Sequence, residues 1–201
     1  MNNNILSLPG YRLYEYKIVL QPHDELWNKI IQVKKDFAQK FEEPAAEWGK
    51  PQMTLATFSQ LQMMEERVCN RLRIIAMAMP AFKVELQGFG SYPTHSIFIQ
   101  VESKVPLQMV VRHLKTAQPL LKTNENKPHF MDNFFINIAR QLLPWQYEKS
   151  WKEFSQKHFS GRFIAKNMLL LRRSEGVKSF QPIARFDFLN MPVITRQGAL
   201  F

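Results

Sequence analysis

The order of strand-like and helix-like segments is the feature that most restricts how this chain can fold. Alternating β-branched and aromatic residues, typical of strands, occupy residues 12–20, 52–58, 82–89, 96–101, 134–140, 163–171 and 180–189. Apolar residues at helical spacing occupy residues 22–41, 60–77, 106–121 and 144–154. The two kinds of segment do not follow the fixed period of a parallel strand–helix repeat. The order therefore predicts an α+β protein with antiparallel sheets flanked by helices.

Size and composition limit the organisation of the chain. Its 201 residues, of which 45% are hydrophobic, allow one substantial core, so we expect a single domain spanning residues 1–201. No stretch approaches the roughly 18 consecutive apolar residues of a membrane-spanning helix, and the N-terminal segment lacks the pattern of a secretory signal. The lone Cys69 allows no internal disulfide. These observations predict a cytoplasmic protein with no membrane contact.

Several common chemical signatures are missing from the sequence. It contains no glycine-rich phosphate loop, no dinucleotide-binding motif and no CxxC pair. These absences argue against the usual nucleoside-triphosphatase and zinc-binding classes. We therefore expect no cofactor and no metal.

Positive charge is concentrated toward the C-terminus. The chain has a net charge of +10, and residues 157–201 carry two acidic side chains against eight basic ones. The basic residues are Lys157, Arg162, Lys166, Arg172, Arg173, Lys178, Arg185 and Arg196. They could form a surface that faces nucleic-acid phosphates, or only a solvated face that keeps the protein soluble.

Two predicted strands look like internal counterparts. Residues 50–56 read KPQMTLA and residues 134–140 read FFINIAR, so both contain the pattern X-apolar-polar-apolar-Ala. Side chains two residues apart on a strand point to the same face, which pairs Gln52 with Thr54 and Phe135 with Asn137. Side by side, the two strands would place four side chains in one groove. Alternating strands are common, however, and an ordinary pair of core strands could show the same pattern.

A wider set of segments makes the pattern more specific. Three segments, taken with the order of elements, resemble the two-histidine (2H) phosphoesterase superfamily, which includes 2′-5′ RNA ligases and cyclic nucleotide phosphodiesterases. The segments read LQGFGSYPTHSIFIQVE, FINIAR and FIAKNMLLLRRSEGVKSFQPIARFDF. The resemblance covers residues 11–189. It implies a bilobal, pseudo-twofold α+β fold in which two central strands each deliver a His-x-Thr/Ser motif to a shared cleft. In such a site one imidazole accepts a proton, the other donates one, and the hydroxyl groups hold the phosphate.

The sequence departs from that motif at the atoms that carry the chemistry. The two motif positions read Gln52-Met53-Thr54 and Phe135-Ile136-Asn137, so that only Thr54 matches the motif. Neither an amide nor a phenyl ring can transfer a proton near neutral pH, and each general acid or base typically contributes about 10²–10⁴ in rate. The resemblance therefore implies a catalytically degenerate protein that binds a nucleotide, an RNA end or another phosphorylated ligand. Gln52, Thr54 and Asn137 would supply hydrogen bonds and Phe135 a stacking face for a base.

Three further residues bear on this interpretation. Arg140 ends the second motif strand, where it could reach a phosphate or form a structural ion pair. Tyr92 lies where family members carry an aromatic residue near the cleft, and it could stack on a base or pack in the core. His129 precedes the second motif by six residues, and an active phosphoesterase or RNA ligase using His129 with Thr54 is an alternative function. A protein-interaction scaffold without a small ligand is the third.

Overall fold

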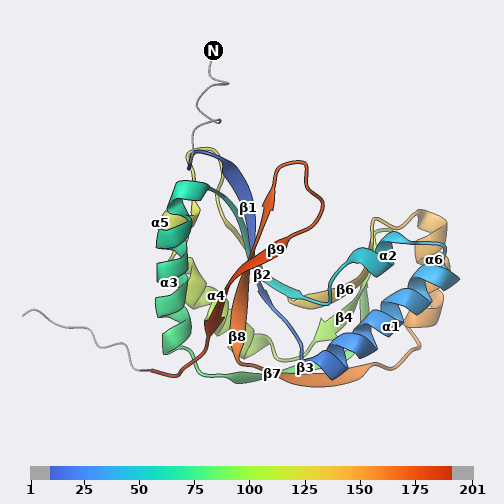
Figure 1. The fold of residues 1–201 in the computed structure, drawn as a ribbon. Coiled ribbons are helices and arrows are strands. Elements are labelled where there is room, and N and C mark those ends of the chain that lie inside the picture. The colour runs from blue at the N-terminus through green and yellow to red at the C-terminus, as the bar shows by residue number, and fades with distance from the viewer. Residues whose placement is uncertain (1–9, 192–201) are drawn as a thin grey trace, which may run out of the picture.

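A computed structural model describes residues 10–191, and within them two antiparallel sheets form the framework (Figure 1). The first sheet has the strand order β5 (His129–Phe130), β2 (Met53–Leu61), β1 (Leu13–Leu20), β8 (Asn167–Ser174), β9 (Gln181–Asp187). The second has the order β6 (Phe135–Arg140), β4 (Ser96–Val101), β3 (Phe82–Tyr92), β7 (Ser160–Ala165). This architecture confirms the predicted α+β class.

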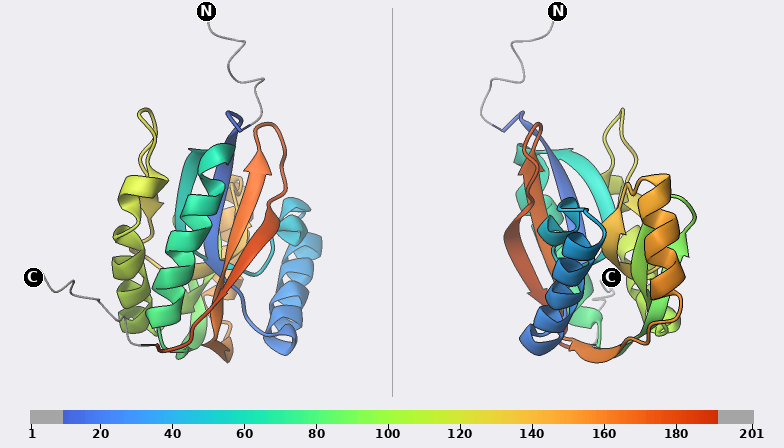
Figure 2. Two further views of the ribbon diagram at one scale, coloured as in Figure 1. Left: turned by 60° about the vertical axis from the view of Figure 1, so that its left-hand side comes forward. Right: turned by 90° about the vertical axis from the view of Figure 1, so that its right-hand side faces the viewer.

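Two groups of helices cover the outer faces of the sheets and give the protein its two lobes (Figures 1 and 2). The five-stranded sheet carries the short 3-10 helix η2 (Gln62–Met64) and the helices α3 (Glu65–Ala78), α4 (Lys104–Lys115) and α5 (Gln118–Leu121). The four-stranded sheet carries α1 (Asp24–Lys40), α2 (Ala45–Trp48) and α6 (Pro144–Phe154). None of the helices within residues 10–191 is long and apolar enough to cross a membrane.

Helix α1 illustrates how the sequence builds these layers. Asp24 and Glu25 occupy its first turn, where negative charge opposes the helix dipole. Ile30 and Phe37 recur on one face and are fully buried. The ring of Phe37 packs 5.3 Å from that of Phe154 in α6, which joins the two helices over the same sheet.

The predicted strand over residues 163–171 is wrong in one respect, because it spans two strands in different sheets. Ala165 pairs with Phe82 of the four-stranded sheet, whereas Asn167 pairs with Asp187 of the five-stranded sheet. The chain crosses between the lobes at Lys166. Apolar residues continue on both sides of the crossing, so the sequence pattern does not mark it.

Three other boundaries differ from the predicted ones. Residues 60–61 complete β2 by pairing with β1, and the helix predicted from residue 60 therefore begins at Glu65. The helix predicted over residues 106–121 is divided into α4 and α5. Residues 122–133, to which the sequence pattern assigns neither strand nor helix, contain the two-residue strand β5, which pairs with β2.

The two lobes repeat the same strand arrangement around the two motif strands. The order β2-β1-β8-β9 in one sheet corresponds to β6-β4-β3-β7 in the other. Each motif strand also has a bulge at the same motif position, because the pairing skips Leu55 in β2 and Ile138 in β6. A bulge inserts one residue and changes the direction of neighbouring side chains. The shared bulge makes Gln52 and Phe135 equivalent positions and supports the pseudo-twofold relation.

Candidate functional site

A cavity of about 530 Å³ lies between the two motif strands. Gln52, Thr54 and Asn137 line it from the motif positions, and Arg140 lines it from the end of β6. Among residues 10–191, these four side chains form no hydrogen bond or ion pair. No buried side-chain nitrogen or oxygen atom in the same residues lacks a partner, so the polar atoms of these four side chains are not buried. Their polar groups are therefore solvated and free to bind a ligand.

Phe135 differs from the other three motif residues because it is not part of the cavity wall. It shares a strand face with Asn137, but its ring packs 4.7 Å from that of Phe98 and 5.7 Å from that of Tyr92. Tyr92 is 41% exposed and belongs to this aromatic cluster rather than to the core. Favourable contacts between the rings account for the position of Phe135. The expectation of four side chains in one groove is thus met by three.

Lys34 of α1 reaches the back of the cavity and holds the bulge of β6. β6 is an edge strand, so its outer carbonyl groups have no neighbouring strand to bind. The Lys34 ammonium donates to the carbonyl oxygens of Asn137, at 3.3 Å, and Ile138, at 2.8 Å. At the equivalent bulge in β2, the backbone N–H of Met131 performs this role by donating to the Leu55 carbonyl.

The electrostatic environment of the cavity is strongly positive. Six of its lining residues are basic and none is acidic; they are Lys17, Lys34, Lys50, Arg140, Arg173 and Lys178. Burial, followed by the neighbouring Arg140, lowers the pKa of Lys34 to about 8. Burial, then Arg140 and Arg173, also lowers the pKa of Lys17. Arg140 therefore lies close enough to both lysines to disfavour their charged forms, although burial is the larger cause.

Two aromatic residues complete the wall. Trp48, at the end of α2, is 75% exposed although it is a large apolar side chain. The ring of Phe180 is held by two cations, with the Lys17 ammonium 4.2 Å and the Arg173 guanidinium 4.6 Å from its centroid. The two rings offer apolar surface next to the basic groups.

Sequence reasoning missed Lys17, Lys34, Trp48 and Phe180. One signal for Lys34 was available, since it falls between Ile30 and Phe37 on the buried face of α1. A lysine on such a face needs a polar partner. The other three residues carry no comparable signal, because their approach to the motif strands depends on how distant segments pair.

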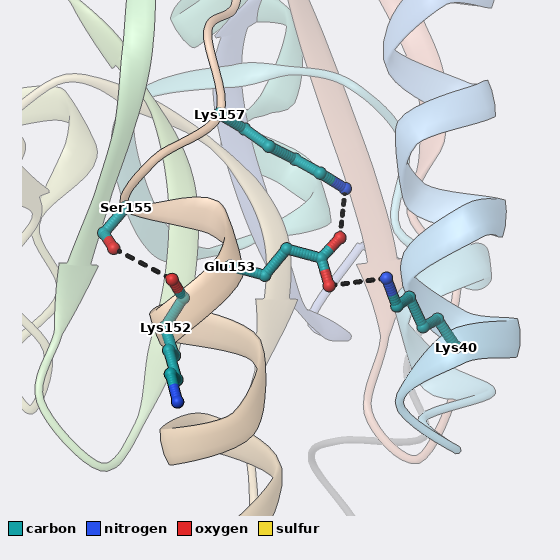
Figure 3. Close-up of polar contacts among 5 residues, drawn as sticks. All are labelled: Lys40, Lys152, Glu153, Ser155 and Lys157. Carbon is teal, nitrogen blue, oxygen red and sulfur yellow. Dashed lines mark hydrogen bonds and ion pairs between the residues drawn. The ribbon is translucent and has the colours of Figure 1, made fainter.

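The basic C-terminal third does not form one phosphate-facing surface within residues 10–191. Arg173 and Lys178 line the cavity, but Arg172 points to the opposite face of β8 and binds Glu65 at 2.9 Å. Other members form local pairs: Lys157 with Glu153, and Arg185 with Asp187. Figure 3 shows that Glu153 also binds Lys40, which links α6 to α1. Arg196 lies outside the described residues.

His129 lies in β5, opposite Thr57 of β2. It is exposed and does not line the cavity. The part of the chain that the structure describes also contains no group of three or more histidine, cysteine, aspartate or glutamate residues placed to hold a metal ion. The cavity itself therefore offers cations, amides and a hydroxyl group.

Comparisons with solved structures agree with this fold. Escherichia coli LigT complexed with 3′-AMP matches with a TM-score of 0.60 at 12% identity, over 88% of this chain and 99% of LigT. LigT complexed with NADP+ matches with a TM-score of 0.55 at 13% identity, over 89% of this chain and 99% of LigT. TT0787 of Thermus thermophilus matches with a TM-score of 0.58 at 11% identity, over 87% and 98% of the two chains. At these identities the likeness establishes the fold.

The family is established by sequence. The model of the 2′-5′ RNA ligase superfamily matches residues 22–177, which is more than half of the chain. The bilobal fold with two equivalent motif strands is that of a 2H phosphoesterase-like protein. The chain belongs to the 2′-5′ RNA ligase superfamily, which confirms the resemblance drawn from its sequence. No curated protein matches it in sequence.

Proposed function

We propose that this protein binds a phosphorylated ligand, either a nucleotide or a phosphate-bearing RNA end, in the cavity between its motif strands, without two-histidine catalysis. One observation carries the proposal. The free polar groups of Gln52, Thr54 and Asn137 share a wall with six basic residues and no acidic one.

These groups are suited to phosphate oxygens. Arg140 can donate two parallel hydrogen bonds, and hydrogen bonds from charged donors are roughly twice as strong as neutral ones. Thr54 and the amide groups of Gln52 and Asn137 add neutral donors. The occurrence of LigT complexes with 3′-AMP, NADP+, phosphate and ATP supports a ligand of this class for the present protein.

The same wall lacks the groups that the family reaction requires. Gln52 occupies one histidine position and cannot change its protonation state near neutral pH. Phe135 occupies the other, and its ring packs against Phe98 and Tyr92. No histidine lines the cavity, so proton transfer to and from a phosphate ester has no imidazole to rely on.

Aromatic side chains near the cavity can hold a base. Trp48 and Phe180 lie beside the basic groups, and the cluster of Tyr92, Phe98 and Phe135 lies next to Asn137 on the same sheet. Stacking on an aromatic ring typically contributes about 1–3 kcal/mol per base and tolerates any sequence. We place the base on Trp48, because its large exposed surface adjoins the cations, with the Phe135 cluster as a second stacking position.

Two assays on one preparation test the proposal. A short fluorescent RNA with a terminal phosphate should bind, and the same RNA without that phosphate should bind more weakly. Arg140→Gln should weaken binding of the phosphorylated RNA, whereas Arg112→Gln, an exposed change in α4, should not. Hydrolysis of a 2′,3′-cyclic nucleotide should not exceed the buffer rate. Absence of binding at low salt would overturn the proposal and favour a protein-interaction scaffold.

One observation favours a second candidate, an active phosphoesterase that uses His129. Cross-strand partners share a sheet face, so His129 lies in one row with Thr57 and Lys17, and Lys17 reaches the cavity. Turnover of a cyclic nucleotide that persists in Gln52→Ala but is lost in His129→Ala would establish this candidate.

A further inference from the structure

The cations in the cavity are not neutralised by the protein. Of the six basic residues in the wall, Arg173 has a carboxylate partner, with Glu15 at 2.6 Å. For Lys17, Lys34 and Arg140, no carboxylate lies within ion-pair distance among residues 10–191. Arg140 lies close enough to Lys17 and Lys34 to lower the pKa of both, after the larger effect of burial. Lys50 and Lys178, which like Arg140 are exposed, also have no carboxylate within ion-pair distance in this part of the chain, so five of the six cations are unneutralised.

Lys34 is the cation that water can solvate least, because it is only 2% exposed. Two of its three N–H donors bind the Asn137 and Ile138 carbonyls, and no third acceptor is found in the described part of the chain. Gly49 lies beside the ammonium group, because a Cβ atom at that position would make a tight contact of 3.2 Å with the Lys34 Nζ. Both residues line the cavity. Because Gly49 has no side chain, nothing at this position blocks the approach of an anion from the cavity to the ammonium group.

The number of unneutralised cations indicates how much negative charge the ligand carries. A phosphodiester or cyclic phosphate has one negative charge, which would leave four of the five unneutralised cations without a partner. A terminal di- or triphosphate has about three or four negative charges at neutral pH. Charges within a few ångströms in a partly buried site interact by several kcal/mol, so unmatched charge is costly.

Building on the proposed function, we propose that the cavity recognises a terminal di- or triphosphate, with Lys34 donating its free N–H to a phosphoryl oxygen beside Gly49. A nucleoside di- or triphosphate and the 5′ end of an RNA share this chemistry. Both present a chain of phosphoryl groups to the unneutralised cations and a base to Trp48.

A calorimetric ligand series tests this assignment at fixed ionic strength. The ligands are a nucleoside mono-, di- and triphosphate, the matching 2′,3′-cyclic monophosphate, pyrophosphate, and a short RNA with or without a 5′-triphosphate. Affinity should rise by roughly tenfold or more from the monophosphate to the diphosphate, because an added charge meets an unneutralised cation. Tighter binding of the nucleotides than of pyrophosphate identifies a free nucleotide, and tightest binding of the triphosphorylated RNA identifies an RNA end.

Variants at the back of the cavity separate this site from general electrostatic attraction. Lys34→Met should remove most of the gain between monophosphate and diphosphate. Gly49→Ala should do the same while keeping the lysine, and it should fold, because Gly49 has the ordinary backbone angles φ −75° and ψ 123°. Lys149→Met, an exposed change of the same charge in α6, should leave the gain intact.

Proton uptake gives a second readout that a nonspecific site would not show. A bound polyanion favours the charged form of Lys34, so binding near pH 8 should take up protons, measured in buffers of different ionisation enthalpy. The uptake should vanish in Lys34→Met. Equal affinity for the cyclic monophosphate and the diphosphate would overturn this inference while leaving the proposed function standing. Failure of every ligand to bind would overturn both.

Discussion

The protonation of Lys34 should make the stability of this protein depend on pH in an unusual direction. Its pKa is lowered from 10.5 to about 8 in the folded protein, mainly by burial. This shift corresponds to about 3 kcal/mol, since one pKa unit is about 1.4 kcal/mol. Between these two pKa values the unfolded chain holds a proton that the folded protein has released. Stability then increases with pH, because the unfolded state binds more protons.

Substitution of Lys34 isolates this effect from the titration of other groups. Lys34→Met keeps a long side chain and removes both the charge and its two hydrogen bonds to Asn137 and Ile138. Loss of those bonds costs about 1.5–3 kcal/mol each and should be largely independent of pH below 8. The difference in unfolding free energy, wild type minus variant, should therefore be constant below pH 8. It should then increase by about 2–3 kcal/mol toward pH 10.

Urea unfolding followed by circular dichroism, at intervals from about pH 7 to pH 10, measures this difference. Met is chosen because it fills nearly the same volume, and a parallel series on Lys149→Met controls for an exposed lysine. A difference that stays constant over the whole range would refute the reasoning. It would mean that Lys34 is solvated in the folded protein or that its ammonium group has a stronger partner than the two carbonyls.

Three further predictions concern the neighbouring residues. Arg173→Ala should reduce the slope of log K for RNA binding against log salt concentration by about 0.7 for each phosphate contact that is lost. Arg172→Ala should leave this slope unchanged and lower the free energy of unfolding. The pKa of Glu153 is lowered first by its hydrogen bond to Lys157 and then by that to Lys40. Glu153→Gln should therefore lower the unfolding free energy above about pH 5 by at most about 1 kcal/mol. This difference should shrink at lower pH, as acid protonates the wild-type carboxylate. The double variant Gln52→His, Phe135→His should hydrolyse a 2′,3′-cyclic nucleotide weakly if the imidazole at position 135 turns out of the aromatic cluster toward the cavity. Hydrolysis at the buffer rate would show that this imidazole stays in the cluster.

The sequence was most informative where local pattern and local structure coincide. The alternating segments around Gln52 and Phe135 predicted two equivalent strands, and both strands carry a bulge at the same position. The amphipathic pattern of residues 22–41 predicted α1, including its buried stripe. In each case the spacing of neighbouring residues determines which side chains share a face.

Pairing between distant segments limited what could be predicted from the sequence. Residues 163–171 read as one strand, yet their two halves join different sheets, because strand partners are chosen by non-local contacts. The cavity has the same origin: Lys34, Trp48 and Phe180 come from three separate segments that meet only after folding. Phe135 was assigned to the groove from its motif position, whereas its ring is positioned by Phe98 and Tyr92.

A titration with a nucleoside diphosphate, followed through the backbone amide resonances of the isotope-labelled protein, tests the central claim most directly. The account predicts that the largest shifts fall on Thr54, Asn137 and Arg140 and that they saturate. It also predicts that these shifts disappear in Arg140→Gln. Saturable shifts confined to residues that do not line the cavity, such as Glu85 and Arg162, would contradict it, as would the absence of any shift at low salt.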